Sequence, residues 1–159
     1  MSQKITPCLW FEDNAEEALE FYTSIFDDAR VTSVSRYGEG GPFTAGTLLM
    51  GTLELAGQQF MVLNGGPHDA FNDAVSFYIE CETQEEVDRY WDALLAGGGQ
   101  PTQCGWLKDK FGVSWQVIPE ALRRYMNDPD QEKAQRVMEA MLKMVKIDVP
   151  TLDAAYAGR

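Results

Sequence analysis

The stretch that decides the fold is NAEEALEFY, residues 14–22, which returns 69 positions later as TQEEVDRYW, residues 83–91. Each copy opens with a residue suited to cap a helix, Asn14 or Thr83, and has acidic residues in its first turn. The apolar positions 18, 21, 22, 25 and 26 recur at 87, 90, 91, 94 and 95, spaced for one face of a helix. An internal repeat of this kind predicts one supersecondary unit built twice.

Strand-like runs surround both predicted helices. Residues 6–11 precede the first helix and residues 75–80 the second, and both runs are rich in β-branched and aromatic residues. Further runs of this kind follow each helix: 30–37, 47–55 and 59–63 in the first half, and weaker ones around 102–108 and 113–118 in the second. The chain is therefore predicted to read strand–helix–strand–strand–strand, twice.

Alternation along the strands assigns their side chains to two faces. The face predicted to lie under the helices carries Cys8, Trp10, Phe60, Val62, Phe77, Ile79, Trp115 and Val117. The other, more mixed face carries Pro7, Leu9, Phe11, Met61, Leu63, Ser76, Tyr78, Glu80, Ser114, Gln116 and Ile118. A curved sheet with a mixed concave face is a natural place for a ligand cavity.

The predicted modules occupy residues 1–66 and 74–119, and a helical tail fills 120–159. Pro129 interrupts the tail, residues 131–146 carry an apolar stripe with two methionines, and Pro150 marks a last short helix over 151–157. The stripe fits packing on the same domain or on the partner of a dimer, and the sequence leaves both open.

Composition narrows the class of protein. The chain has 159 residues, 45% of them hydrophobic, which fits one globular domain. No apolar run is long enough to span a membrane, and the N-terminal residues lack a signal-peptide pattern, so we expect a cytoplasmic protein with reduced cysteines. The net charge is −12, and residues 1–119 hold 18 acidic against 6 basic residues. Such a surface repels phosphate backbones, so nucleic acid is not an expected partner.

The paired modules resemble the vicinal-oxygen-chelate (glyoxalase/bleomycin resistance) superfamily. The specific resemblance is to its PhnB-like branch, and it rests above all on CGWLKD, residues 104–109, and FGVSWQVIP, residues 111–119. Residues 7–26, 63–67, 74–81, 98–100 and 136–158 extend it over nearly the whole chain. The resemblance implies an α+β fold in which two βαβββ modules form a curved mixed sheet, and it implies a homodimer.

Two properties associated with the resemblance do not fit these residues. Members of the branch are often labelled 3-demethylubiquinone 3-methyltransferases, but no glycine-rich stretch here opens a helix after a strand, as a methyl-donor site usually requires. Metal-dependent members take four ligands from the first and last strands of the modules. By the register of the repeat, those places fall near Pro7, Met61, Ser76 and Gln116. These are poor donors for Zn or Mn, so we expect neither metal nor cofactor; a shift of one residue would bring Glu12, Glu54 or Glu80 closer.

Three residues are candidates for chemistry. Cys104 lies in a glycine-containing loop near Lys108 and Lys110, whose charges would favour a thiolate, although a lone cysteine is more often simply packed. Glu80, if buried, would suit a general base. His68, the only histidine, lies in a loop and could exchange protons near neutral pH.

Six residues are predicted to bind a ligand: Asn64, Ser76, Tyr78, Trp106, Ser114 and Gln116. They offer hydrogen bonds and stacking around the mixed face, or, for Asn64, a turn that could hold an anionic group. We therefore expect a small-molecule-binding protein with a metal-free cavity. The alternatives are a lyase, isomerase or oxygenase-type enzyme using a metal or Cys104, and a regulatory dimer that acts through its tail helices.

Overall fold

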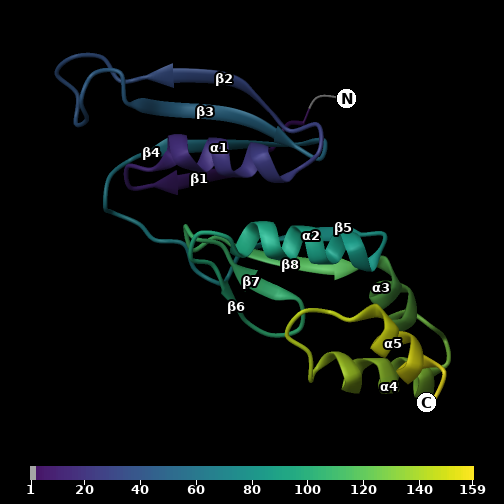
Figure 1. The fold of residues 1–159 in the computed structure, drawn as a ribbon. Coiled ribbons are helices and arrows are strands. Elements are labelled where there is room, and N and C mark those ends of the chain that lie inside the picture. Colours follow the sequence, from purple (N-terminus) through teal and green to yellow (C-terminus); the bar gives the residue numbers. More distant parts are fainter. Residues whose placement is uncertain (1–2) are drawn as a thin grey trace. The chain divides into compact units, whose positions relative to one another are not determined.

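The computed structural model describes residues 3–159, which divide into two compact units, Met1–Ala70 and Phe71–Arg159 (Figure 1). Each unit begins with one strand, one helix and then three more strands, in that order, and the second unit continues into the tail helices. The predicted repeat of strand–helix–strand–strand–strand is confirmed, and so is the α+β class.

The first unit is a four-stranded mixed sheet with one helix. Its elements are β1 (Cys8–Phe11), α1 (Ala15–Ile25), β2 (Arg30–Arg36), β3 (Leu48–Leu55) and β4 (Gln58–Asn64). The strand order is β1-β4-β3-β2, and only the β1–β4 pair is parallel. Helix α1 packs closely on β3, where a side chain at Gly51 would collide with Leu19 of the helix.

The second unit repeats this plan. Its elements are β5 (Ser76–Cys81), α2 (Gln84–Leu95), β6 (Gln100–Pro101), β7 (Trp106–Lys108) and β8 (Ser114–Pro119). The order is β5-β8-β7-β6, again with the first pair parallel. The weak strand predicted around 102–108 is really two short strands, because residues 102–105 form a loop in which Cys104 has a left-handed backbone with φ of 56°.

The predicted faces of β5 and β8 are correct, but those of β1 are reversed. Leu9 pairs with Val62 and is buried with Phe11, whereas Cys8 is exposed. The cause is the connection to the helix: three residues join β1 to α1, but only two join β5 to α2. The helices therefore repeat at 69 residues while these strands repeat at 70, with Phe11 corresponding to Cys81. The helix offset of 69 therefore misaligns β1 with β5 by one residue, and a shift of one residue along a strand exchanges its two faces.

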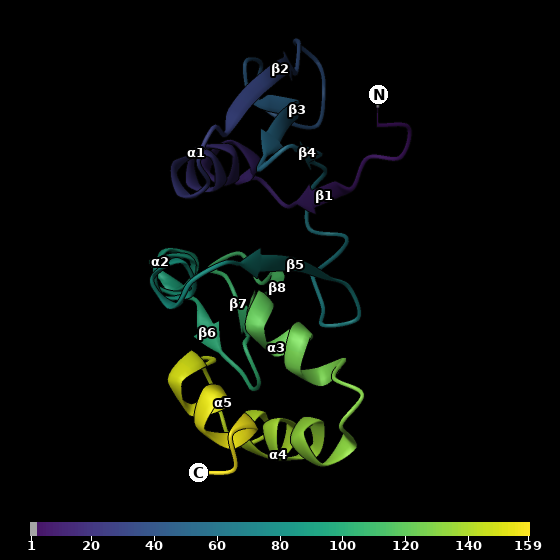
Figure 2. The same cartoon turned by 90° about the vertical axis from the view of Figure 1, so that its right-hand side faces the viewer.

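The tail forms three helices, α3 (Glu120–Met126), α4 (Gln131–Met141) and α5 (Val149–Tyr156), which lie with the second unit in both views (Figures 1 and 2). Their core is a cluster of Ile118, Leu122, Val137, Met144, Ile147 and Leu152. The predicted helix over 131–146 ends early, at Met141, and Leu142 and Val145 of its stripe are exposed. The longest helix within residues 3–159, α2, has 12 residues, and none there is long and apolar enough to cross a membrane.

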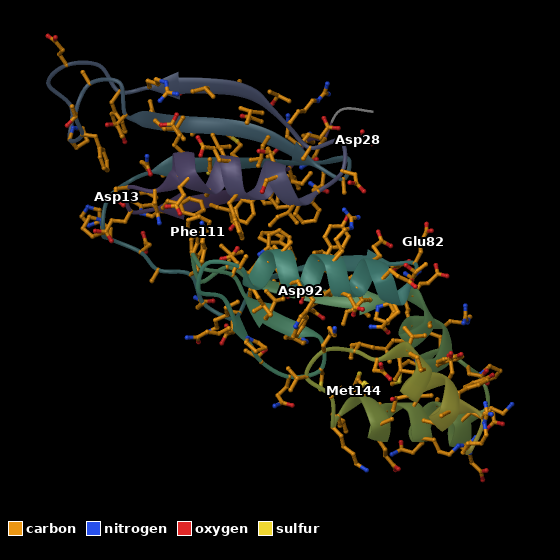
Figure 3. All side chains as sticks on the ribbon, viewed as in Figure 1. Asp13, Asp28, Glu82, Asp92, Phe111 and Met144 are labelled. Carbon is orange, nitrogen blue, oxygen red and sulfur yellow. The ribbon has the colours of Figure 1, made fainter. Side chains whose placement is uncertain are left out.

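The segment after α4 is held by backbone and side-chain hydrogen bonds. The amides of Cys104 and Gly105 donate to the carbonyls of Met144 (labelled in Figure 3) and Val145, at 2.9 and 2.8 Å. The Gln84 amide donates to the Ile147 carbonyl at 3.1 Å and accepts from the Val149 amide at 2.7 Å. The tail is therefore tied to α2 and to the β6–β7 loop of its own chain.

A buried carboxylate organises the turn between β7 and β8. Asp109 is 3% exposed, and its Oδ1 accepts from the amides of Phe111 and Val113 at 2.9 and 3.0 Å. Its Oδ2 accepts from the indole Nε1 of Trp115 at 2.9 Å. One side chain thus fixes both the turn and Trp115 of β8.

We predict that Gln84→Ala lowers the free energy of unfolding by about 1–3 kcal/mol, because two part-buried backbone groups of the tail lose their partners. The matched control is Gln135→Ala, whose amide donates to Glu139 at the exposed side of α4 and whose effect should stay within about 0.5 kcal/mol. Urea unfolding measures both, and equal effects would contradict the assigned role of Gln84.

We predict that Asp109→Ala costs about 3 kcal/mol, since three N–H donors lose their acceptor in a buried place. Asp92→Ala, at an exposed position of α2 (Figure 3), should change stability by no more than about 0.5 kcal/mol. Thermal or urea unfolding gives the comparison. A tolerated Asp109→Ala would mean that the turn does not depend on its carboxylate.

Candidate functional site

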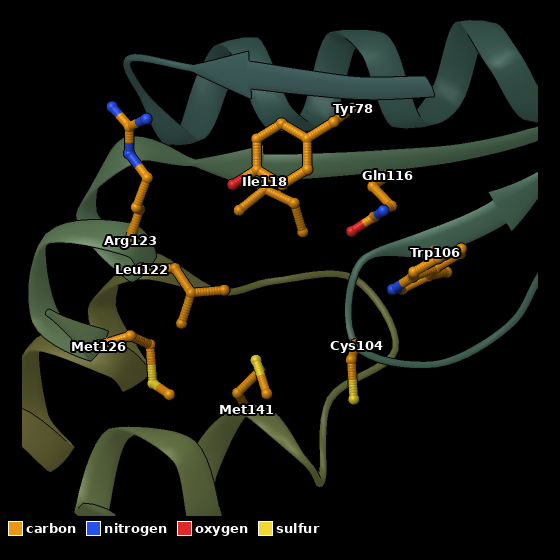
Figure 4. A pocket seen from close by; sticks show the side chains of 9 residues that line it. All are labelled: Tyr78, Cys104, Trp106, Gln116, Ile118, Leu122, Arg123, Met126 and Met141. Atoms are coloured by element: carbon orange, nitrogen blue, oxygen red, sulfur yellow. The ribbon is translucent and has the colours of Figure 1, made fainter. Parts of the chain in front are cut away.

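A cavity of about 250 Å³ lies in the second unit, between the open face of the sheet and the tail helices (Figure 4). Tyr78, Trp106, Gln116 and Ile118 line it from the strands, and Cys104 from the β6–β7 loop. The opposite wall comes from the tail, with Leu122, Arg123 and Met126 on α3 and Met141 on α4. The cavity thus joins residues from five elements and one loop.

Strand pairing explains why the sheet residues meet. Gln116 pairs with Tyr78 on the parallel side and with Trp106 on the antiparallel side, so all three side chains project from one face. The Gln116 amide donates to the Ser76 hydroxyl at 2.9 Å, which fixes its orientation. Figure 4 shows the amide oxygen of Gln116 turned toward the space between sheet and tail. This oxygen is a positioned acceptor.

The charges at the cavity are balanced. Arg123 is the one ionised side chain among the described residues that line it, and its guanidinium pairs with the Glu80 carboxylate at 2.9 Å. Glu80 is exposed and bound to Arg123, so it does not meet the burial expected of a general base. Burial and, secondly, the negative charge of Glu80 raise the pKa of Tyr78, so its phenol stays protonated at neutral pH.

Cys104 is the thiol at the cavity. The two ammonium groups expected to favour its thiolate have other partners: Lys108 pairs with Asp73 at 3.1 Å, and Lys110 lies over the ring of Phe111. The other two thiols differ. Burial raises the pKa of Cys81 to about 12, and the partial desolvation of the more exposed Cys8 thiol raises its pKa as well. Cys104 therefore remains the candidate nucleophile by position alone.

His68 belongs to the first unit, whereas the residues of the cavity belong to the second. It contributes, with Glu12, Asp13, Phe43 and others, to a hollow of about 290 Å³. Its ring meets Trp10 edge-on at 6.4 Å, and the Trp10 indole donates to the Gly66 carbonyl at 2.9 Å. The amides of Gly65 and Gly66 donate to the carbonyls of Phe11 and Glu12, so these two amides are already bonded within the protein and are not offered to an anionic ligand.

Asn64 has a structural position in the first unit. It is 1% exposed, its Oδ1 accepts from the Ala15 amide at 2.9 Å, and its Nδ2 donates to the Leu48 carbonyl at 3.0 Å. It therefore caps the start of α1, whereas Asn14, the expected cap, makes no such bond. Ser114 is buried beside Ser76 in the second unit, with which it pairs across β5 and β8.

Sequence reasoning missed the four lining residues of the tail. An apolar stripe predicted that α4 packs on something, but periodicity does not say against what. Nor did it single out α3, a seven-residue helix that follows β8 without any loop. The signal available was Pro119, whose fixed φ suits the start of a helix directly after a strand.

The residues do not suit the metal centre associated with the fold. Within the described part of the chain there is no group of three or more histidines, cysteines or acids able to hold a metal ion. With the corrected register, Thr6 replaces Pro7 as the counterpart of Ser76, and the remaining places are Met61 and Gln116. Hydroxyl, thioether and amide groups are poor partners for Zn or Mn.

Comparisons with known proteins agree on the fold. The PhnB protein of Bacillus cereus, assigned provisionally as 3-demethylubiquinone-9 3-methyltransferase, is 42% identical with a TM-score of 0.68, over 74% of this chain and 99% of that one. Protein PA1353 of Pseudomonas aeruginosa matches at 22% identity and a TM-score of 0.62, over 74% and 98%. The fosfomycin resistance protein FosX of Listeria monocytogenes, solved with Mn(II) and sulfate, matches at 17% identity and a TM-score of 0.53, over 79% and 98%.

The last two comparisons show the fold alone, and comparison with curated protein sequences finds no match. The predicted glyoxalase/bleomycin resistance fold with C-terminal helices is confirmed. The family profile described as 3-demethylubiquinone-9 3-methyltransferase matches residues 3–118, and residues 136–158 lie beyond the matched part. The chain therefore belongs to this PhnB-like family of the vicinal-oxygen-chelate superfamily.

Proposed function

We propose that the protein binds a small, neutral, flat organic molecule in the cavity of its second unit and needs no bound metal to do so. The observation that carries the proposal is the lining: an apolar space with a few hydrogen-bonding groups, in which the charge of Arg123 is already paired with Glu80. A charged ligand would have to break that pair or bring an uncompensated charge into an apolar space, which is costly. A neutral ligand avoids both.

The chemistry of the walls favours an aromatic body with a polar edge. Trp106 and Tyr78 offer ring surfaces, and Met126 and Met141 offer polarizable thioethers that pack well against rings. The Gln116 amide oxygen, held by the bond to Ser76, supplies an acceptor for a hydroxyl or N–H group. A cavity of about 250 Å³ is near the lower end of small-molecule sites.

Methyl transfer does not gain support from the site. Within residues 3–159 the turns that lead from a strand into a helix are 12–14 and 82–83, and β8 runs directly into α3. None of these contains glycine, which a nucleotide-type methyl-donor site would use to bring its backbone close to the ligand. The methyltransferase activity in the family description therefore has no support in these turns, and the site favours ligand binding over methyl transfer.

The alternative is an enzyme that uses Cys104. The observation in its favour is that Cys104 lines the same cavity with a left-handed backbone, the kind of local strain that gathers at functional sites. A lyase or isomerase would use this thiol on a ligand oriented by Gln116 and Trp106.

As further parts of the proposal, the protein works in the cytoplasm, where its three free cysteines stay reduced, and forms a homodimer.

We predict that 2-naphthol binds the wild-type protein and that 2-naphthoate binds at least roughly tenfold more weakly, about 1.4 kcal/mol, since only the acid must bring a charge into the cavity. Titration calorimetry measures both. Trp106→Ala and Gln116→Ala should each weaken 2-naphthol by a similar factor, while Gln103→Ala, a change at an exposed position of the β6–β7 loop, should not. Tighter binding of the naphthoate would contradict a neutral ligand.

We predict that Cys104→Ser binds 2-naphthol as the wild type does, because the binding role assigns the thiol no bond to the ligand. Iodoacetamide labelling followed by mass spectrometry should leave Cys81 unmodified in the folded protein at neutral pH, since a pKa of about 12 keeps that thiol protonated. Labelling of Cys104 far faster than Cys8, with protection by the ligand, would favour the enzyme instead.

A further inference from the structure

The tail lies beyond the part of the chain that the family profile matches. The family profile ends at Ile118, and the Bacillus cereus protein is matched over 99% of its length by only 74% of this chain. About a quarter of the present chain therefore has no counterpart in that relative, and residues 119–159 lie beyond the family profile. What those residues do must be argued from their own contacts.

The tail builds one wall of the cavity. Leu122, Arg123, Met126 and Met141 all come from beyond Ile118, whereas the facing residues come from the part that the family profile matches. In Figure 4, Met126 and Met141 lie on the side of the cavity that is away from Tyr78 and Gln116. Removing the tail side chains would leave an open sheet face where there is now a bounded space.

This wall is firmly attached. Gly105 donates its amide to the carbonyl of Val145 in the tail, and its carbonyl accepts from the amide of Val117 in β8, both at 2.8 Å. Gly105 thus links residue 145 of the tail to β8 by backbone hydrogen bonds. A Cβ at Gly105 would lie 3.0 Å from Ile147 of the tail and 2.7 Å from Ile118. Lys146 pairs with Asp88 of α2 at 2.7 Å. The position of the wall relative to the sheet is thus fixed on several sides.

We propose that the C-terminal extension selects the ligand by size, with Met126 and Met141 setting the depth of the cavity. The inference rests on the proposed function, since it concerns the same cavity. The two methionines stand opposite the hydrogen-bonding residues of the sheet, so a ligand anchored at Gln116 extends toward them. Their flexible thioethers adapt to flat molecules up to the size of the space and exclude larger ones.

The test is a series of neutral aromatic alcohols of increasing size, 4-cresol, 2-naphthol and 1-pyrenol, titrated into the full-length protein. The wild type should bind the first two and should bind the third at least tenfold more weakly than 2-naphthol. The double variant Met126→Ala, Met141→Ala should bind 1-pyrenol at least tenfold more tightly than the wild type does and bind 4-cresol less tightly. Met141→Phe should weaken 2-naphthol and retain 4-cresol.

Met138→Ala is the matched control, because Met138 lies one turn earlier on α4, is 37% exposed and does not line the cavity. It should leave the size order unchanged, and thermal unfolding of each variant checks that the tail stays folded. A shift with Met138→Ala equal to that with the double variant would overturn the proposal, since tail packing rather than the wall would then set the limit.

The two proposals fail in different ways. If no neutral aromatic alcohol binds the wild type, the proposed function fails. If 2-naphthol binds and Trp106→Ala weakens it, but the methionine variants keep the wild-type size order, only the role of the tail is wrong. A size order that moves with Met126 and Met141 alone supports both.

Discussion

The parallel pairing of β5 with β8 is the constraint on which the site depends. It sets Tyr78 beside Gln116 and Ser76 beside Ser114, and it leaves one edge of β8 free for β7, which brings Trp106 to the same face. Since β8 ends at Pro119 and α3 begins at Glu120 with no loop between them, the same strand also sets the direction in which the tail starts. A single register therefore determines both the floor of the cavity and the direction of its opposite wall.

The two units show how one plan accommodates different local needs. Asn64 ends β4, and Pro119 ends β8 at the corresponding place of the repeat. In the first unit this residue supplies the missing cap of α1, because Asn14 makes no capping bond. In the second unit Thr83 caps α2 by accepting from the Glu86 amide at 3.2 Å. Because Thr83 already caps α2, the last residue of β8 does not have to do so, and a proline there can lead directly into α3.

Sequence patterns predicted the repeat, the faces of the second unit and the meeting of Tyr78, Trp106 and Gln116, because these follow from local periodicity and from the pairing of strands within a repeated unit. They failed where a connection or a distant contact decides. The face of β1 depends on one extra residue before α1, and the end of α4 depends on bonds from Cys104 and Gly105. The burial of Asn64 and the position of Met126 depend on packing between segments far apart in sequence, which no local pattern encodes.

The contact at Gly105 also bears on how such proteins can be told apart. Its backbone has φ of 85°, and a Cβ there would meet both Ile118 of β8 and Ile147 of the tail, so both conformation and room demand glycine. A relative with a larger residue at this position could carry a C-terminal extension, but it would have to place it elsewhere. Glycine after the loop cysteine is thus required by β8 as well as by the tail, so the aliphatic residue at the place of Ile147 is the half of this contact that can distinguish tail-covered members in genomes.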